Sequence, residues 1–252
     1  MDNVKLVPFL NYQFSVFEVA ELRDNLLSGT FDGKSIHFIA ASTFFGRFQG
    51  KSFREIWNDG ILISDSRPLS RYLRFFNSEL VQIRGTDFTR IYLSEISCRA
   101  VLIGSTPDVT NAIKNIFEKI NPGLVIVKTF HPQIHSDKDF QLIEWSRVLG
   151  EHKADVVWIA LGSPKQDYVA QKLAKEFHVP VIAVGAAFDF LSDSKSEANS
   201  IVKRLYLEWA FRLLSEPRRL WKRYLLGNLK FIFLIFLDLL QKNLPKIISK
   251  TK

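Results

Sequence analysis

Cysteine is nearly absent from this chain of 252 residues, in which Cys98 is the only one. A disulfide bond within the chain is therefore excluded, and Cys98 is most simply a buried apolar residue of a protein from a reducing compartment. The five histidines are scattered, and none is spaced from a Cys, Asp or Glu in the way that metal ligands are. The sequence thus predicts neither a metal site nor any other cofactor.

Long hydrophobic runs are absent too. The apolar run 231–237 stops at Asp238, so it is far shorter than the roughly 20 residues that a spanning helix needs. The N-terminal segment lacks the basic stretch and unbroken apolar core of a signal peptide. We therefore expect no ordinary transmembrane helix and no cleaved leader.

The chain does contain an alternation of apolar, strand-like runs with helical periodicities. Hydrophobic residues make up 47% of it and 22 are Phe, which suffices for one large core or for one domain with an appendage. Residues 1–35 read as an irregular lead-in with one helix. Strands are expected at 36–41, 60–64, 100–104, 124–127, 156–161 and 179–184, and helices at 17–27, 53–57, 68–76, 88–93, 106–120, 140–149 and after 162. The alternation predicts an α/β fold: a doubly wound, mainly parallel sheet with helices on both faces.

The most informative segment is 154–190, where two apolar runs flank one short polar turn. Gly162, Ser163 and Gln166 follow the first run, at the start of the expected helix. Such turns bind ligands in parallel sheets, because helix N-termini present free N–H groups to anions. Ser163 and Gln166 also fit a capping box, with Pro164 at the first helical position. A ligand contact and a structural cap therefore compete for the side chain of Gln166.

Other expected strand ends carry residues of the same kind. Gly185 follows the second run, and Asp189 lies just beyond it in an apolar strand end, where its carboxylate must be capped, paired or bound to a sugar hydroxyl. Gly104 and Ser105 form a further strand-to-helix turn, which is a weaker candidate for a diphosphate. Asp65 ends the run 60–64 and is either a general base or a residue that caps a turn.

The net charge of +8 is concentrated near the C-terminus. The segment 203–230 has only Glu208 and Glu216 to oppose its basic residues, which are Lys203, Arg204, Arg212, Arg218, Arg219, Lys222, Arg223 and Lys230. Because Trp and Leu are interleaved with them, the segment is typical of an amphipathic structure on an anionic membrane surface. The alternative is a helix packed on the core with a solvated basic face. We expect a core at 1–200 and a helical, membrane-associated appendage at 201–252.

Taken together, these motifs are specific enough to resemble a known family. The order and spacing of the turns and of the basic segment resemble the WecG/TagA/CpsF glycosyltransferases over roughly residues 36–228; the segments concerned are 85–87, 103–104, 161–167, 184–190 and 207–225. The resemblance implies transfer of a sugar, often of N-acetylmannosamine type, from a UDP donor to a polyprenyl-diphosphate-linked saccharide, with inversion and without a metal. It also implies a peripheral protein at the cytoplasmic face of the bacterial inner membrane that serves cell-wall teichoic acid, capsule or other exopolysaccharide synthesis.

The same resemblance suggests roles for individual residues. Asp65 matches the family's proposed catalytic base, and the arginines of the appendage match residues that close over the diphosphate. Gln82 stands where the family has Arg, with Arg84 two residues further on. The implied substrate and nucleotide contacts are Thr43, Gln82, Arg84, Asp87, Gly104, Gly162, Ser163, Gln166, Gly185, Asp189, Arg212, Arg218 and Arg223.

Two other classes of function compete with this interpretation. A catalytically weak or inactive relative could serve as a membrane-docked partner in a polysaccharide assembly complex. A nucleic-acid binder would fit the net charge, but the sequence contains no recognised nucleic-acid-binding module, so we expect no nucleic-acid partner. Nothing in the sequence decides between a monomer and a homo-oligomer.

Overall fold

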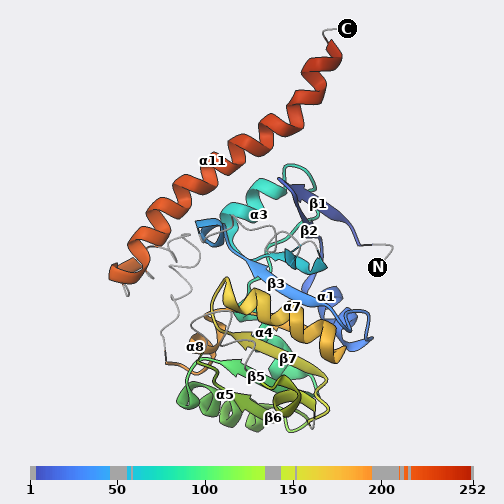
Figure 1. Cartoon of the computed structure of the whole chain (residues 1–252), viewed down its shortest axis with the longest axis vertical. Helices are drawn as coiled ribbons and strands as arrows, with labels where there is room; N and C mark the ends of the chain where they lie inside the picture. The colour runs from blue at the N-terminus through green and yellow to red at the C-terminus, as the bar shows by residue number, and fades with distance from the viewer. Residues whose placement is uncertain are drawn as a thin grey trace.

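The computed structural model describes residues 4–45, 56–57, 59–133, 143–150, 152–194, 210, 213–214 and 217–250. These residues form an eight-stranded sheet in the order β1-β2-β4-β3-β8-β7-β5-β6 (Figure 1). Its strands are β1 (Leu6–Phe9), β2 (Tyr12–Ser15), β3 (Ser35–Ile39), β4 (Ile61–Ser64), β5 (Arg99–Gly104), β6 (Val125–Phe130), β7 (Val156–Ala160) and β8 (Val181–Ala183). All neighbours run parallel except β1 and β2, which form an antiparallel hairpin at one edge. The expected α/β fold with a mainly parallel sheet is confirmed.

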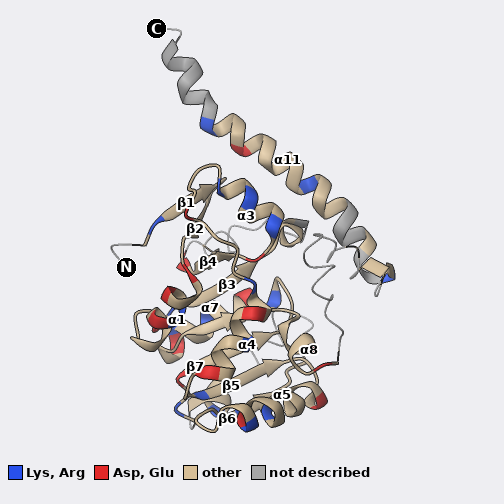
Figure 2. Ribbon diagram, turned by 180° about the vertical axis from the view of Figure 1, so that it is seen from behind, with Lys and Arg blue, Asp and Glu red and all other residues tan. Residues whose placement is uncertain are grey.

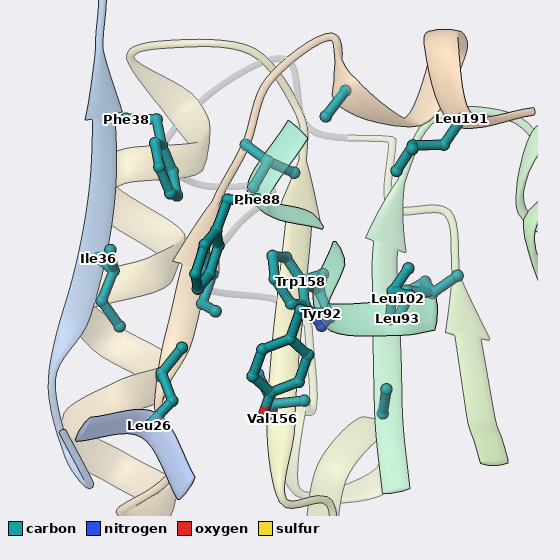
Figure 3. Packing of buried hydrophobic residues seen from close by; sticks show 14 of the residues in the cluster. Leu26, Ile36, Phe38, Phe88, Tyr92, Leu93, Leu102, Val156, Trp158 and Leu191 are labelled. Carbon is teal, nitrogen blue, oxygen red and sulfur yellow. The ribbon is translucent and has the colours of Figure 1, made fainter. Parts of the chain in front are cut away.

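Helices cover both faces of this sheet, because the parallel strands bury side chains on each side. One face carries α1 (Val19–Leu27), α4 (Gly85–Glu95), α5 (Pro107–Ile120) and α8 (Ala187–Leu191), and the other carries α7 (Lys165–Phe177) and the π turn η2 (Ser146–Gly150). In β7, Val156 and Trp158 belong to the first core cluster, whereas Val157 and Ile159 belong to the second. Trp158 packs against Tyr92 of α4, with ring centroids 5.4 Å apart (Figure 3).

A third apolar cluster joins the C-terminal helix to the sheet edge. The long helix α11 (Pro217–Lys250) lies across the 3-10 turn η1 (Ala41–Phe45), close to α3 (Arg67–Leu73) and the β1–β2 hairpin (Figure 1). Phe231 of α11 is buried, and its ring centroid lies 5.9 Å from that of Phe9 and 6.2 Å from that of Phe44. The described middle of α11 is thus part of the folded core.

One buried carboxylate fixes α11 further along its length. Asp238 is 1% exposed, and its two oxygens accept hydrogen bonds from the Leu10 N–H at 2.6 Å, the Tyr72 hydroxyl at 2.5 Å and the Lys242 ammonium at 2.6 Å. Lys242 also donates to the Pro8 carbonyl at 2.8 Å. The residue that ends the apolar run in the sequence therefore anchors the helix to the β1–β2 hairpin and to α3. Among the residues that the structure describes, no helix is both long and apolar enough to span a membrane.

The structure corrects several sequence-based expectations. Residues 1–35 contain the β1–β2 hairpin in addition to the expected helix, and the strand expected at 124–127 continues to Phe130. The strand at 179–184 shortens to β8, and Asp189 lies in the helix α8 rather than at a strand end. The segment expected as a helix at 140–149 is described only from residue 143, and there the π turn η2 occupies most of it. Most of the helix expected at 53–57 lies outside the described residues.

Candidate functional site

The carboxyl ends of five parallel strands meet at one edge of the sheet. η1 follows β3 and contains Thr43, while Asp65 comes directly after β4. Gly104 ends β5, the polar turn with Gly162 follows β7, and Gly185 follows β8. This is the edge at which open parallel sheets bind ligands. The fold therefore brings the sequence-predicted residues of the core to a common edge.

Asp65 bridges the end of β4 to the beginning of α4. Its Oδ1 accepts a hydrogen bond of 2.8 Å from the N–H of Gly85, the first residue of α4. Its carbonyl accepts a 2.6 Å hydrogen bond from Nε2 of Gln82. Asp65 thus caps α4 from outside that helix. It does not cap α3, whose N-cap is Ser66. The positive end of the α4 dipole also attracts the carboxylate of Asp65.

The neighbouring charged residues bind one another. Arg84 and Asp87 form an ion pair of 3.2 Å in the first turn of α4, and the side chain of Arg84 is only 18% exposed. Arg90 approaches the same carboxylate at 3.7 Å. Thr43 is buried and accepts a 3.2 Å hydrogen bond from the N–H of Ala40, so its hydroxyl stabilises the turn after β3.

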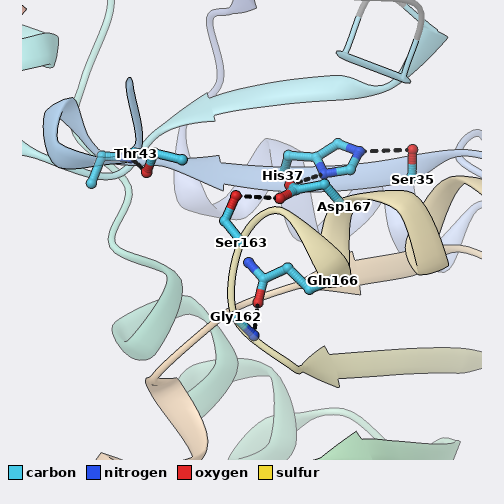
Figure 4. Close-up of polar contacts among 8 residues, drawn as sticks. Ser35, His37, Thr43, Gly162, Ser163, Gln166 and Asp167 are labelled. Atoms are coloured by element: carbon cyan, nitrogen blue, oxygen red, sulfur yellow. Dashed lines mark hydrogen bonds and ion pairs between the residues drawn. The ribbon is translucent and has the colours of Figure 1, made fainter. Parts of the chain in front are cut away.

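The turn after β7 places the side-chain amide of Gln166 between Gly162 and Gly185. Gly162 adopts φ 76° and Gly185 adopts φ 58°, the left-handed region that favours glycine. Oε1 of Gln166 accepts a 3.1 Å hydrogen bond from the Gly162 N–H, and a Cβ on Gly185 would lie 3.7 Å from the Gln166 amide. Gln166 is 5% exposed, yet within the described part of the chain its Nε2 makes no hydrogen bond. Figure 4 shows this nitrogen on the side of the amide that faces away from Gly162.

The expected capping box is wrong. α7 begins at Lys165 with Pro164 as its N-cap, and no side chain caps it. Ser163 instead donates a 2.6 Å hydrogen bond to Oδ2 of Asp167. In a capping box, the Gln166 side chain would accept a hydrogen bond from the N–H of Ser163. Its side-chain oxygen Oε1 instead accepts one from the N–H of Gly162.

A buried polar chain that the sequence reasoning missed lies beneath this turn. Oδ1 of Asp167 is 2.8 Å from Nδ1 of His37, and Nε2 of His37 is 2.9 Å from the Ser35 hydroxyl (Figure 4). His37 is 0% exposed and Asp167 is 1% exposed. Ser35 and Asp167 contact opposite nitrogens of His37, as in a hydrolase triad, but Ser35 is only 2% exposed, so its hydroxyl is closed to a substrate. The one available signal was a histidine inside an otherwise apolar strand.

The turn after β5 is mainly structural. Gly104 adopts φ 100°, and a Cβ there would lie 2.5 Å from the carbonyl oxygen of Ala160, so only glycine allows β5 and β7 to approach this closely. Ser105 donates a 3.3 Å hydrogen bond to Oδ1 of Asp189. This contact joins α8 to the same sheet edge as the other candidate residues.

The comparison with known proteins decides the family. The model of the glycosyl transferase WecG/TagA/CpsF family matches residues 7–245, which is nearly the whole chain. The chain belongs to this family. Two relatives are both named N-acetylglucosaminyldiphosphoundecaprenol N-acetyl-beta-D-mannosaminyltransferase. The one from Bacillus spizizenii W23 is 39% identical over 72 residues, 28% of each chain. The one from Bacillus subtilis 168 is 32% identical over 128 residues, 50% of this chain and 48% of the relative. The matched stretches thus span about half or less of these relatives.

The basic appendage of this WecG/TagA/CpsF chain is only partly described. Arg212 lies outside the described residues, and of Arg223 only the helical backbone is described. Arg218 is exposed in the first turn of α11. The role of these arginines at a diphosphate therefore stays a prediction. Within the described ranges, no three His, Cys, Asp or Glu side chains are grouped closely enough to hold a metal ion.

Proposed function

We propose that this protein transfers N-acetylmannosamine from a UDP donor to a polyprenyl-diphosphate-linked N-acetylglucosamine. The names of the two relatives support the acceptor and the sugar. The observation that carries it is the amide of Gln166, a residue only 5% exposed, whose Nε2 makes no hydrogen bond in the described structure. A ligand that reaches this nitrogen would complete the hydrogen bonds of the amide.

The donor fits the turns after β7 and β8. The positive end of the α7 dipole and the exposed side chain of Lys165 suit a diphosphate, whereas the N–H groups of Gln166 and Asp167 already donate to the carbonyls of Gly162 and Pro164. Gly162 and Gly185 have no side chains, so a ligand can approach the backbone closely. We assign the UDP diphosphate to this turn and the sugar to the region between Gln166 and Asp189.

Asp65 is the proposed general base. In an inverting transfer, its carboxylate takes the proton of the acceptor hydroxyl while that oxygen attacks the anomeric carbon. The bond from this carbon to the UDP oxygen breaks in the same step, and UDP leaves as an anion that N–H dipoles and cations stabilise. The hydrogen bond from Gly85 fixes the direction of the carboxylate at the end of β4.

The acceptor is a lipid, so the enzyme must work at a membrane surface. The exposed face of α11 supports this, since it carries large apolar side chains at helical spacing: Leu226, Leu229, Ile232, Phe233, Phe236 and Leu240. Charged residues are sparse along the described part of α11 (Figure 2). We propose that this face, together with the basic segment 203–230, docks peripherally on the anionic cytoplasmic side of the bacterial inner membrane.

A transfer assay with two substrates tests the proposal. Purified protein, UDP-N-acetylmannosamine and a short-chain polyprenyl-diphospho-N-acetylglucosamine should yield UDP and a lipid-linked disaccharide, which mass spectrometry detects. Omission of either substrate is the control. Binding of UDP without any transfer would contradict the enzymatic proposal and favour the alternative of an inactive, membrane-docked partner in a polysaccharide assembly complex.

A further inference from the structure

The polar chain Ser35–His37–Asp167–Ser163, which is buried except at Ser163, lies directly beneath the proposed donor site. Ser35 and His37 lie on β3, Ser163 lies in the turn after β7, and Asp167 lies in the first turn of α7. The carboxylate of Asp167 uses both oxygens, one toward the imidazole of His37 and one toward the hydroxyl of Ser163. The central strand of the sheet is thereby tied to the turn that holds Gln166.

The sequence makes specific room for this chain. A Cβ on Gly60 would lie 2.8 Å from the imidazole ring of His37 and 3.0 Å from the Ser35 hydroxyl, so any larger residue there would displace both side chains. A buried carboxylate also carries a desolvation cost that an apolar residue of similar size would avoid. His37 occupies a position facing α7, and its register partners on the two neighbouring strands, Leu62 of β4 and Ala183 of β8, are apolar. The polar chain therefore needs a reason other than core packing.

We infer that His37 is a positioning residue, which acts through Asp167 and Ser163 to hold the amide of Gln166 toward the UDP-sugar. Gln166 precedes Asp167 directly, and its own contact with Gly162 spans the same turn. Ser163 and Asp167 fix that turn from beneath, so that its backbone cannot shift without breaking the part-buried hydrogen bond between them. This inference rests on the proposed function, because the ligand of Gln166 is the donor.

The two nitrogens of His37 allow a matched pair of variants. In His37→Asn the side-chain amide takes the place of Nδ1 and keeps a donor for Asp167, whereas in His37→Gln it takes the place of Nε2 and keeps only the contact with Ser35. We expect His37→Gln and Asp167→Asn to lower kcat/KM for the UDP-sugar by about 10- to 100-fold, since a misplacement of about 1 Å in a positioning group has effects of that order. His37→Asn should restore kcat/KM to within about threefold of the wild type, and KM for the lipid acceptor should change little in all three.

A stability control separates positioning from simple destabilisation. Asn121 is a buried polar residue whose Nδ2 donates to the carbonyl oxygens of Leu93 and Ile96, far from the carboxyl ends of the strands. Asn121→Ala should lower the melting temperature but leave kcat/KM for the donor unchanged. The positioning role is wrong if Asn121→Ala lowers kcat/KM for the donor as much as His37→Gln does. It is also wrong if kcat/KM of His37→Asn is no higher than that of His37→Gln.

UDP binding distinguishes this failure from a failure of the proposed function. Isothermal titration of each full-length variant with UDP alone should show the same ranking, with the weakest binding in His37→Gln and Asp167→Asn. Normal transfer by every variant would overturn the positioning role and leave the transferase intact. A wild type that binds UDP without transferring sugar would overturn the proposed activity, while the ranking of UDP affinities would still support or contradict the role of His37.

Discussion

Replacing Asp238 by Ala should loosen the C-terminal helix while the sheet stays folded. The carboxylate accepts hydrogen bonds from Leu10, Tyr72 and Lys242, and its burial leaves little access for water to replace it. Desolvation by burial, together with the hydrogen bond and charge of Asp238, holds the pKa of Tyr72 well above its usual range, so this hydroxyl remains a donor at neutral pH.

The size of the effect follows from the donors left behind. The Leu10 N–H and the Tyr72 hydroxyl would each lose a buried acceptor, at about 1–3 kcal/mol apiece. Lys242 loses less, because it keeps the Pro8 carbonyl and is 25% exposed. We therefore expect a loss of about 2–6 kcal/mol in the docking of α11, which corresponds to roughly a 30- to 25,000-fold larger opening constant.

Hydrogen exchange followed by mass spectrometry measures this opening segment by segment. Peptides from α11 and the β1–β2 hairpin should exchange faster in Asp238→Ala, whereas peptides from β5 and β7 should keep their protection. The control is Asp59→Ala, which removes an exposed ion pair of 2.8 Å with Lys175 and should cost less than about 1 kcal/mol. Unchanged exchange in α11, or an equal effect of Asp59→Ala, would refute the anchoring role of Asp238.

Two further predictions concern a thiol and a surface. Burial, and secondarily the charge of Asp155, raises the pKa of Cys98 from 9.0 to about 12. Between pH 9 and pH 12 the folded state therefore keeps a proton that the unfolded state loses. The contribution of Cys98 to stability is full below pH 9 and falls above it, by up to about 1.36 kcal/mol per pH unit. Chemical denaturation at pH 8 and pH 10 should show a smaller loss of stability for Cys98→Ala than for the wild type, and an equal loss would disprove the assignment. Phe233→Ser combined with Phe236→Ser should reduce sedimentation with anionic vesicles without lowering the melting temperature, because both side chains are more than half exposed, at 57% and 56%. Phe75→Ser, at an 80% exposed site outside α11, is the control, and equal loss of sedimentation there would contradict docking through α11.

The parallel sheet and the location of the site could be predicted from the sequence. The runs at 100–104 and 156–161 are buried on both faces and contain β-branched residues, so they are unambiguous as strands. Gly162 and Gly185 mark the turns where the chain needs left-handed backbone, and both have positive φ in the structure. Strand ends in a parallel sheet share one edge, which is why residues distant in sequence could be assigned to one site.

The elements and contacts that the sequence did not predict also have physical explanations. The β1–β2 hairpin turns at Leu10, which has φ 54° in a position that glycine usually fills, so the usual turn signal is missing. α8 follows an apolar run in which a short helix and a strand cannot be distinguished by periodicity. His37 and Asp167 are far apart in sequence, and only tertiary packing of α7 on β3 brings them together. Asp238 looked like an interruption of an apolar run, because its partners belong to the N-terminal hairpin and to α3.

The transfer assay on Asp65→Asn tests the central claim most directly. The amide oxygen of Asn can still accept the hydrogen bond from Gly85, so the end of β4 and the start of α4 should keep their structure. We predict that the wild type converts UDP-N-acetylmannosamine and polyprenyl-diphospho-N-acetylglucosamine to the lipid-linked disaccharide. The variant should do so about 10²- to 10⁴-fold more slowly with UDP affinity within a few fold, as expected for loss of a general base. Full activity in Asp65→Asn, or no transfer by the wild type, would contradict the account.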